Sequence, residues 1–343
     1  MGVDAGAGAL TPRARDLDED DVRVRPGRGS RPRTRRRPAH EDAVEGFVAS
    51  VDRGRYGVLV GDRTVTAMQA RELGRRGVVV GDQVALAGDT SGAPGTLARV
   101  VRVFPRTTVL RRSADDTDPV ERVIVANADQ LGIVCALADP PPRPRFIDRC
   151  LVAAYDAGLR PLLCLTKADL ASADDLLHAY APLGIGHVAL GRPLDAAQLA
   201  PLRQHLDGRT SVLIGHSGVG KSTLVNALIP DAGRAVGTVS PVTGRGRHTS
   251  SSAVALALPG GGWIIDTPGL RGFGLGHVAP DRVVRAFTDL APGTLACPPG
   301  CDHDQPDCAL DDWVRDQGGD PRLVARLDSL RRLLRSRDGA EAW

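Results

Sequence analysis

The stretch Ser211-Val-Leu-Ile-Gly215-His-Ser-Gly-Val-Gly220-Lys-Ser222 decides how the rest of the chain is interpreted. It fits the pattern G-x-x-x-x-G-K-S, follows an apolar strand (211–215) and precedes an expected helix (223–229), which is the context that a phosphate-binding loop requires. Its glycines allow successive backbone N–H groups to converge on a phosphate oxygen, and the start of the helix favours negative charge there. The stretch therefore predicts a nucleotide-binding site in an α/β domain.

Two residues of the loop have roles that the chemistry of phosphate binding suggests directly. Lys221 would bridge the β- and γ-phosphates, and the Ser222 hydroxyl would hold Mg²⁺. The other expected contacts of the loop are Gly215, Ser217, Gly218, Val219, Gly220 and Thr223. A chance match is the alternative interpretation in a chain with 40 glycines.

A second motif, Asp266-Thr-Pro-Gly269, follows the apolar strand 263–265. A carboxylate at the tip of a parallel strand can hold Mg²⁺ through water, and the N–H of Gly269 can bind the γ-phosphate. The alternative is an ordinary turn, because Pro and Gly favour turns.

A third motif, Thr166-Lys-Ala-Asp169, follows the apolar run 161–165 and comes before the phosphate loop. The Asp169 carboxylate can accept hydrogen bonds from N1–H and the 2-amino group of guanine, whereas adenine offers no donor at N1. Thr166 and Lys167 are expected to take part in the same site. Taken alone, the motif also fits a solvated loop.

Lysine usage supports both phosphate and base recognition. The chain has 44 basic residues, and only Lys167 and Lys221 are lysines. Lys221 lies where a compact ammonium between phosphates suits the site, and Lys167 lies where a straight alkyl stem can pack along a purine.

The order of the motifs predicts a circularly permuted domain. In ordinary GTPases the base-reading motif follows the phosphate loop, whereas here it precedes the loop. Permutation is tolerated when the original termini lie close together at the surface. The segments 244–252 and 266–276 then lead into the C-terminal region, so we expect nucleotide state to move that region.

The cysteines divide into two groups. Cys135, Cys150 and Cys164 lie in apolar segments and are expected to be buried thiols. The other three crowd together with one histidine in the pattern C-x3-C-x-H-x4-C, and these four residues are candidate metal ligands: Cys297, Cys301, His303 and Cys308. Three sulfurs and one imidazole make a closed tetrahedral zinc site, which predicts one structural Zn²⁺; free thiols in a loop are the alternative.

The pattern of apolar residues along the chain predicts a multidomain protein. Short strands between residues 45 and 104, punctuated by Gly and Asp, are typical of a small barrel. Strands and helices then alternate, which indicates a parallel sheet covered on both faces. The expected parts are an arm (1–40), a barrel (41–112), the permuted nucleotide domain (113–280) and a helical zinc-knuckle domain (281–343).

The first part has an unusual charge pattern, although the net charge of the chain is only +3. Seven arginines fall between Arg25 and Arg37, after the acidic run 16–21. We expect a disordered arm, either a solvated tail or a polyanion-binding segment. The sequence has no apolar run of membrane-spanning length, which predicts a cytoplasmic protein with no membrane partner.

The barrel, the three nucleotide motifs in this order and the Cys-Cys-His-Cys knuckle together resemble the ribosome small-subunit-dependent GTPase family, RsgA. The resemblance implies an OB-fold barrel, a permuted GTPase domain and a zinc domain that helps the protein to dock on the small ribosomal subunit and its rRNA late in maturation. It implies a monomeric GTPase that binds GTP and GDP and is stimulated by the subunit. Within the segment 244–249, it implies that Thr249 is a Mg²⁺ ligand.

Hydrolysis has a less obvious basis in the sequence. Leu270 follows Gly269 where many GTPases carry a water-orienting Gln. His248 is the candidate to orient or deprotonate the water, and a solvated histidine is the alternative. Thr166 stands where Asn is usual, and no Ser-Ala loop is evident near residues 189–191.

Two further functions remain compatible with the sequence. One is a GTP-dependent metal chaperone that carries zinc on the cysteine cluster. The other is an RNA-binding protein that holds GTP without turning it over.

Overall fold

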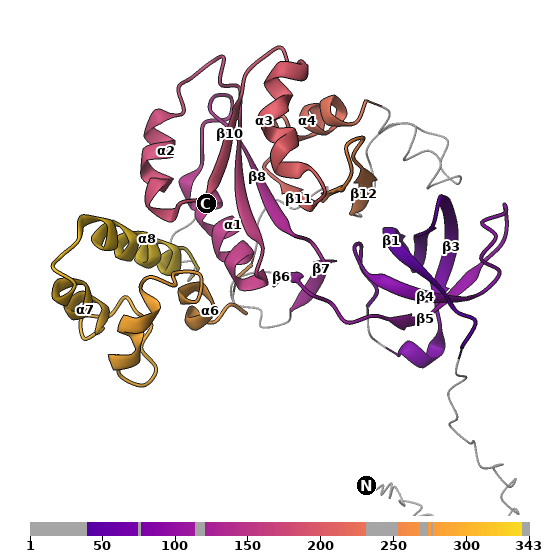
Figure 1. Ribbon diagram of the computed structural model, residues 1–343, viewed down its shortest axis with the longest axis horizontal. Coiled ribbons are helices and arrows are strands. Elements are labelled where there is room, and N and C mark those ends of the chain that lie inside the picture. The colour runs from indigo at the N-terminus through magenta and orange to yellow at the C-terminus, as the bar shows by residue number, and fades with distance from the viewer. Residues whose placement is uncertain are drawn as a thin grey trace, which may run out of the picture. The chain divides into compact units, whose positions relative to one another are not determined.

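The computed structural model describes residues 40–74, 77–113, 121–230, 253–267, 274–275 and 277–337. The expected arm lies outside the described residues apart from His40, and His248, Thr249 and Gly269 also lie outside them. Figure 1 shows the described elements as coloured ribbons.

The first five strands form a closed β-barrel. They are β1 (Val44–Asp52), β2 (Arg55–Val60), β3 (Arg63–Gln69), β4 (Gln83–Gly88) and β5 (Ala98–Val103). They pair in the order β1-β2-β3-β5-β4, and β4 also pairs with β1. Alternate residues such as Val48, Val58 and Val100 are fully buried inside. This is the five-stranded closure of an OB-fold, which confirms the expected barrel.

One expected barrel strand is shorter than its apolar run suggests. The apolar run 77–87 is interrupted by Gly81 and Asp82, and β4 begins only at Gln83. The buried Asp82 carboxylate accepts a 2.8 Å hydrogen bond from the N–H of Val79, and Arg106 binds both of its oxygens at 2.7 and 2.8 Å. These contacts fix a turn before β4.

A two-stranded sheet follows the barrel. It pairs β6 (Val109–Arg112) with β7 (Arg122–Ala126) in antiparallel fashion. Asn127, just after β7, donates a 2.9 Å hydrogen bond to the carbonyl of Gly81. The side chain thereby fastens this small sheet to the turn before β4.

The central sheet carries the expected alternation of strands and helices. Its strands are β8 (Gln130–Ala136), β9 (Arg160–Thr166), β10 (Gly186–Leu190), β11 (Thr210–Ile214), β12 (Val254–Ala257) and β13 (Trp263–Asp266). They lie in the order β10-β9-β8-β11-β13-β12, all parallel except β12. The last of these strands, β12, also pairs with β1 of the barrel, at Ser50 and Val254.

Helices cover both faces of this sheet, as predicted. They are α1 (Pro144–Ala157), α2 (Asp174–Tyr180), α3 (Ala196–Leu206) and α4 (Lys221–Leu228). One buried cluster joins the sheet to α1 and includes Ile133 and Leu151. A second cluster joins the sheet to α3 and α4 and includes Leu202 and Leu224. The three predicted core thiols, Cys135, Cys150 and Cys164, are all buried.

The C-terminal region is helical. Its elements are α6 (Pro280–Val284), the 3-10 turn η4 (Ala291–Ala296), α7 (Leu310–Asp316) and α8 (Pro321–Arg337). Helix α8 lies against α1 (Figure 1), and its Leu330 and Leu333 are fully buried. None of the helices that the structure describes combines the length and the apolar composition needed to cross a membrane.

The arginines of α8 hold the helix in place. Four of them form ion pairs with carboxylates of other segments: Arg326 with Asp289, Arg331 with Asp311, Arg332 with Asp148, and Arg335 with Asp304. The basic character of this helix is therefore largely neutralised within the fold.

Candidate functional site

The carboxyl ends of the parallel strands bring the three nucleotide motifs together. Leu213 of β11 lies opposite Asp266 of β13, and Leu190 of β10 lies opposite Thr166 of β9. Because all these strands run in the same direction, the segments that follow them meet at one edge of the sheet. This is where ligands bind in open α/β sheets.

The phosphate loop connects β11 to α4 and depends on its glycines. A Cβ atom on Gly215 would lie 2.5 Å from the carbonyl oxygen of Val134, so no other residue fits there. Gly218 and Gly220 have φ angles of 83° and 91°, which side chains rarely tolerate. Val219 between them is buried and anchors the loop in the core.

The polar residues of the loop remain accessible. Ser217, Ser222 and Thr223 are exposed, and Lys221 is half-buried. The Lys221 ammonium forms an ion pair with the carboxylate of Asp266. Thr267, the next residue, donates a 3.2 Å hydrogen bond to the carbonyl of Leu213. The second motif is thereby held directly against the strand that leads into the loop.

The Thr166 side chain connects the base-reading motif to the phosphate loop. Its hydroxyl donates a 2.6 Å hydrogen bond to the carbonyl of Val219, and the residue is buried. Lys167 follows with a φ angle of 59°, an uncommon conformation for a residue with a side chain. Its ammonium donates a hydrogen bond to the carbonyl of Asp139.

Asp169 lies against the segment that follows β10. Its exposed carboxylate accepts a 3.0 Å hydrogen bond from the backbone N–H of Arg192. A Cβ atom on Gly191 would be 3.3 Å from the backbone nitrogen of Asp169, so the absence of a side chain allows this close approach. The segment without a Ser-Ala motif therefore orients the Asp169 carboxylate through a backbone donor.

A wall of the site that the sequence did not indicate comes from residues 139–146. A Cβ atom on Gly218 would be 3.6 Å from Pro140. The His216 ring packs on Phe146 with ring centroids 4.0 Å apart, and burial, with the nearby Arg143 guanidinium, lowers the pKa of His216. The only hint in the sequence was the run of prolines after β8.

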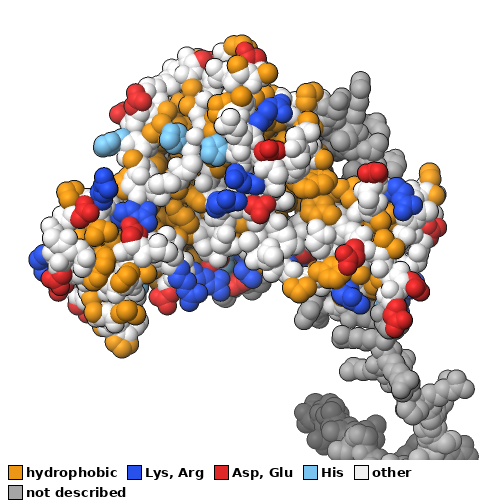
Figure 2. All heavy atoms as spheres, viewed as in Figure 1, with side chains coloured by type: hydrophobic (Ala, Val, Ile, Leu, Met, Phe, Trp, Pro, Cys, Tyr) orange, Lys and Arg blue, Asp and Glu red, His pale blue; other side chains and the backbone are white. Residues whose placement is uncertain are grey.

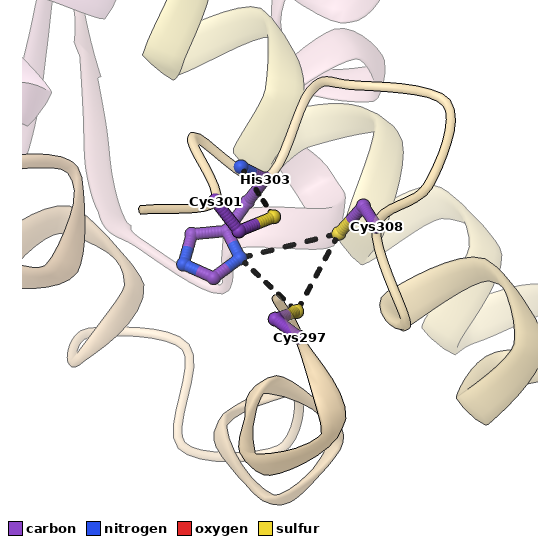
Figure 3. Close-up of side chains that lie close together, drawn as sticks. All are labelled: Cys297, Cys301, His303 and Cys308. Carbon is purple, nitrogen blue, oxygen red and sulfur yellow. Dashed lines mark hydrogen bonds between the residues drawn. The ribbon is translucent and has the colours of Figure 1, made fainter. Parts of the chain in front are cut away.

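The predicted metal ligands form a compact cluster (Figure 3). Their donor atoms all lie within 4.8 Å of one another. The sulfurs of Cys297 and Cys308 are 3.9 Å apart, and Nδ1 of His303 lies 3.6 and 4.0 Å from them. With Zn–S bonds of about 2.3 Å, a tetrahedron requires an S···S separation of about 3.8 Å. The donor set therefore fits one zinc ion.

The surroundings of the cluster fix its ligands. Nε2 of His303 lies 3.8 Å from the carboxylate of Asp281, which orients Nδ1 toward the sulfurs. Arg331 of α8 donates to the carbonyl of His303 at 3.2 Å. In the metal-free protein, burial raises the pKa of the Cys308 thiol to about 12, with the neighbouring thiols contributing.

Comparisons with known proteins identify close relatives. The model of the RsgA GTPase family matches residues 103–276. A protein of Pseudomonas putida named small ribosomal subunit biogenesis GTPase RsgA is 44% identical over 219 residues, a match that spans 62% of this chain and 63% of that protein. One of Pseudomonas aeruginosa with the same name is 40% identical over 245 residues, covering 69% of this chain and 70% of the relative.

Solved structures share the fold. YjeQ from Thermotoga maritima superposes with a TM-score of 0.62 at 23% identity, covering 87% of this chain and 100% of that chain. YloQ, described as a circularly permuted GTPase, superposes with a TM-score of 0.60 at 22% identity, covering 90% and 99%. With the family model matching half of its length, the chain belongs to the RsgA GTPase family.

Proposed function

We propose that this chain binds GTP with Mg²⁺ and hydrolyses it to GDP and phosphate. The observation that carries the proposal is the meeting of three motifs from distant parts of the sequence at one edge of the sheet. Lys221 with Asp266 and Thr166 with Val219 are the contacts that join them. A loop of exposed N–H and hydroxyl groups beside a lysine suits the phosphates of a nucleotide.

Guanine recognition rests on Asp169. Its exposed carboxylate can accept two hydrogen bonds from N1–H and the 2-amino group of guanine, while the Arg192 N–H donates to one of its oxygens at 3.0 Å and orients it. Adenine offers no donor at N1, so it would leave the Asp169 carboxylate partly unpaired. This arrangement favours GTP over ATP.

Two residues fit a magnesium ion. Ser222 is exposed in the first turn of α4, and Asp266 lies at the end of the neighbouring strand β13. Hydroxyl and carboxylate oxygens are the ligands that Mg²⁺ prefers, and the ion would neutralise phosphate charge. Since Lys221 pairs with Asp266, nucleotide binding must redirect the ammonium to the phosphates. Thr249 is proposed as a further ligand, and the N–H of Gly269 as a γ-phosphate donor.

His248 is proposed to orient the attacking water, because Leu270 cannot do so. The variant His248→Ala should bind GTP normally and lose most of its subunit-stimulated hydrolysis. Hydrolysis by His248→Ala at the rate of the unaltered protein would remove this residue from the mechanism.

The small ribosomal subunit is the proposed partner, with assistance in its late maturation as the proposed role. The names of the Pseudomonas relatives support this proposal. The barrel (41–112) and the arm (1–40) would contact rRNA, and the zinc domain (281–343) would help docking while the domain 113–280 hydrolyses GTP. The protein would act as a cytoplasmic monomer.

One experiment separates the proposed function from its alternatives. GTP hydrolysis is measured with and without purified small ribosomal subunits, with Lys221→Ala as the inactive control. We expect slow hydrolysis alone and a large increase with subunits. Binding of GTP without turnover under both conditions would favour the non-catalytic RNA-binding protein instead.

A further inference from the structure

A groove of about 370 Å³ lies at the edge of the central sheet opposite the nucleotide site. It is lined by Gln130, Arg160 and Gly186, which are the first residues of β8, β9 and β10. The nucleotide motifs follow the ends of the same sheet's strands, so the two sites are separated by the length of the strands. A ligand in the groove would not compete with GTP.

The lining of the groove is basic. It includes Arg160, Arg209, Arg326 and His205, and no Asp or Glu is among the described residues that line it. Figure 2 shows one face of the molecule, on which blue Lys and Arg side chains stand among red Asp and Glu side chains, so the basic character is a property of the groove lining and not of the whole face. A concave surface lined by positive charge attracts anions and raises their local concentration.

One of these arginines, Arg326, is held in place by several contacts within the fold. Arg326 binds both carboxylate oxygens of Asp289 at 2.8 and 2.9 Å and donates to the carbonyl of Pro182 at 3.0 Å. Its guanidinium also lies 4.6 Å from the centre of the Phe287 ring. The charge of Arg326 is therefore already balanced, and the side chain fixes the C-terminal region to the groove.

The other two arginines retain free donors. Arg160 is exposed, and its side chain has no partner among the residues that the structure describes. Arg209 uses Nη1 to donate to the carbonyl of His205 at 2.7 Å, which orients the guanidinium. The adjoining carboxylate of Asp129 accepts the N–H of Thr210 at 2.7 Å. Two guanidinium groups at one groove are suited to a phosphate, because their N–H donors match its oxygens.

We propose that this groove binds the phosphate backbone of an RNA strand. The groove is open to solvent, as a polymer requires, and its lining also includes the apolar residues Leu162, Leu183 and Ile185. That the RNA belongs to the small ribosomal subunit rests on the proposed function. The groove and the nucleotide site would then lie at opposite edges of one sheet. Arg326, a residue of α8, lines the groove and so connects it to the C-terminal region.

The test uses the full chain and three variants. Arg160→Glu reverses a charge that has no partner among the described residues, and Arg160→Ala with Arg209→Gln removes both guanidinium groups. Arg322→Glu is the matched control, because Arg322 is exposed on α8 and does not line the groove. Binding to a fluorescent single-stranded RNA and to small ribosomal subunits is measured between about 50 and 200 mM salt. Hydrolysis of GTP without subunits shows that each variant is folded.

We expect Arg160→Glu to weaken binding of RNA and subunits about 5- to 20-fold and to lessen the salt dependence by about one unit of log–log slope. Arg322→Glu should change neither, and GTP hydrolysis without subunits should be unchanged in all three variants. Equal losses of RNA binding in Arg160→Glu and Arg322→Glu would overturn the proposed RNA site in the groove, since they would indicate only general charge attraction.

A free nucleotide is the competing source of a phosphate. Binding of guanosine monophosphate that depends on Arg160, together with unchanged RNA binding, would replace the RNA proposal with a small-molecule site. Failure of the unaltered chain to bind subunits would contradict the proposed function, and the RNA oligonucleotide would still test the groove by itself.

Discussion

The hydroxyl of Thr166 donates a 2.6 Å hydrogen bond to the carbonyl of Val219, 53 residues further along the chain. This bond joins the base-reading motif to the phosphate loop in a domain where the two occur in reversed order. Asn is usual at this position, and its side-chain amide could donate the same hydrogen bond. The Thr166 hydroxyl therefore supplies the donor that Asn would supply.

Removing this hydroxyl should loosen the nucleotide site. Thr166→Val preserves the shape of the side chain but leaves the Val219 carbonyl without its partner, which costs about 1–3 kcal/mol when the group is buried. We expect lower stability by that amount and GTP affinity reduced several-fold, measured by thermal unfolding and by titration with a fluorescent GTP analogue. Thr166→Ser and Thr166→Asn, which keep a donor, should retain affinity. If Thr166→Val bound GTP as the unaltered chain does, the bond would have no part in holding the loop.

Asp169 should determine which base is bound. Asp169→Asn replaces an acceptor with an amide that can donate to the 2-oxo group of xanthine, so GTP affinity should fall at least about tenfold and affinity for xanthosine triphosphate should rise. Competition binding with GTP, ATP and xanthosine triphosphate measures the change. Asp175→Asn, an exposed change in α2, is the control. An unaltered preference in Asp169→Asn would place the base elsewhere.

The motif residues each lie in a short pattern with its own chemistry, so the sequence alone is enough to propose them as the candidate site. Strand β10 alternates exposed and buried residues, and helix α3 ends at the turn residues Asp207 and Gly208, so both are local features of the sequence. Strands β7 and β12 were not expected, because short strands are stabilised by pairing with segments that are distant in sequence.

Contacts between distant residues were equally inaccessible to sequence reasoning. Nothing in the Arg-rich sequence of α8 indicates that Arg332 faces the buried Asp148. The hydrogen bond from the backbone N–H of Arg192 to the Asp169 carboxylate likewise depends on where β10 ends relative to β9. Local chemistry predicted the candidate site, whereas the groove required the packing of the C-terminal region on the sheet.

The cysteine cluster should hold one zinc ion that the protein does not transfer. Cys308→Ser removes a ligand from a buried site, so zinc content should fall from one per chain toward zero and the region 291–316 should unfold. Metal analysis and hydrogen exchange measure these effects. Cys164→Ala, which alters a buried thiol of the sheet, should retain the zinc. Rapid zinc transfer to a chelator that depends on GTP would instead favour the metal chaperone.

The buried His277 ring should make stability depend on pH. Its Nδ1 lies 2.8 Å from the Ser113 hydroxyl, and its Nε2 lies 3.9 Å from the Asp156 carboxylate. Burial lowers the pKa of His277 below its usual 6.5, although Asp156 acts in the opposite direction. Glu121 also raises this pKa, whereas Arg111 and Arg282 lower it.

Because the folded-state pKa lies below the unfolded value, the unfolded chain takes up a proton first as the pH falls through 6.5. Folding stability from the neutral ring is therefore present above pH 6.5 and is lost on acidification, until the pH passes below the folded-state pKa. His277→Asn keeps a hydrogen-bonding group near Ser113 but cannot titrate, so its Tm should fall less between pH 7.5 and 5.5 than that of the unaltered chain. The exposed His187→Asn should behave like the unaltered chain, and zinc content measured at each pH controls for metal loss. Identical pH profiles for His277→Asn and the unaltered chain would mean that this ring takes up its proton equally in both states.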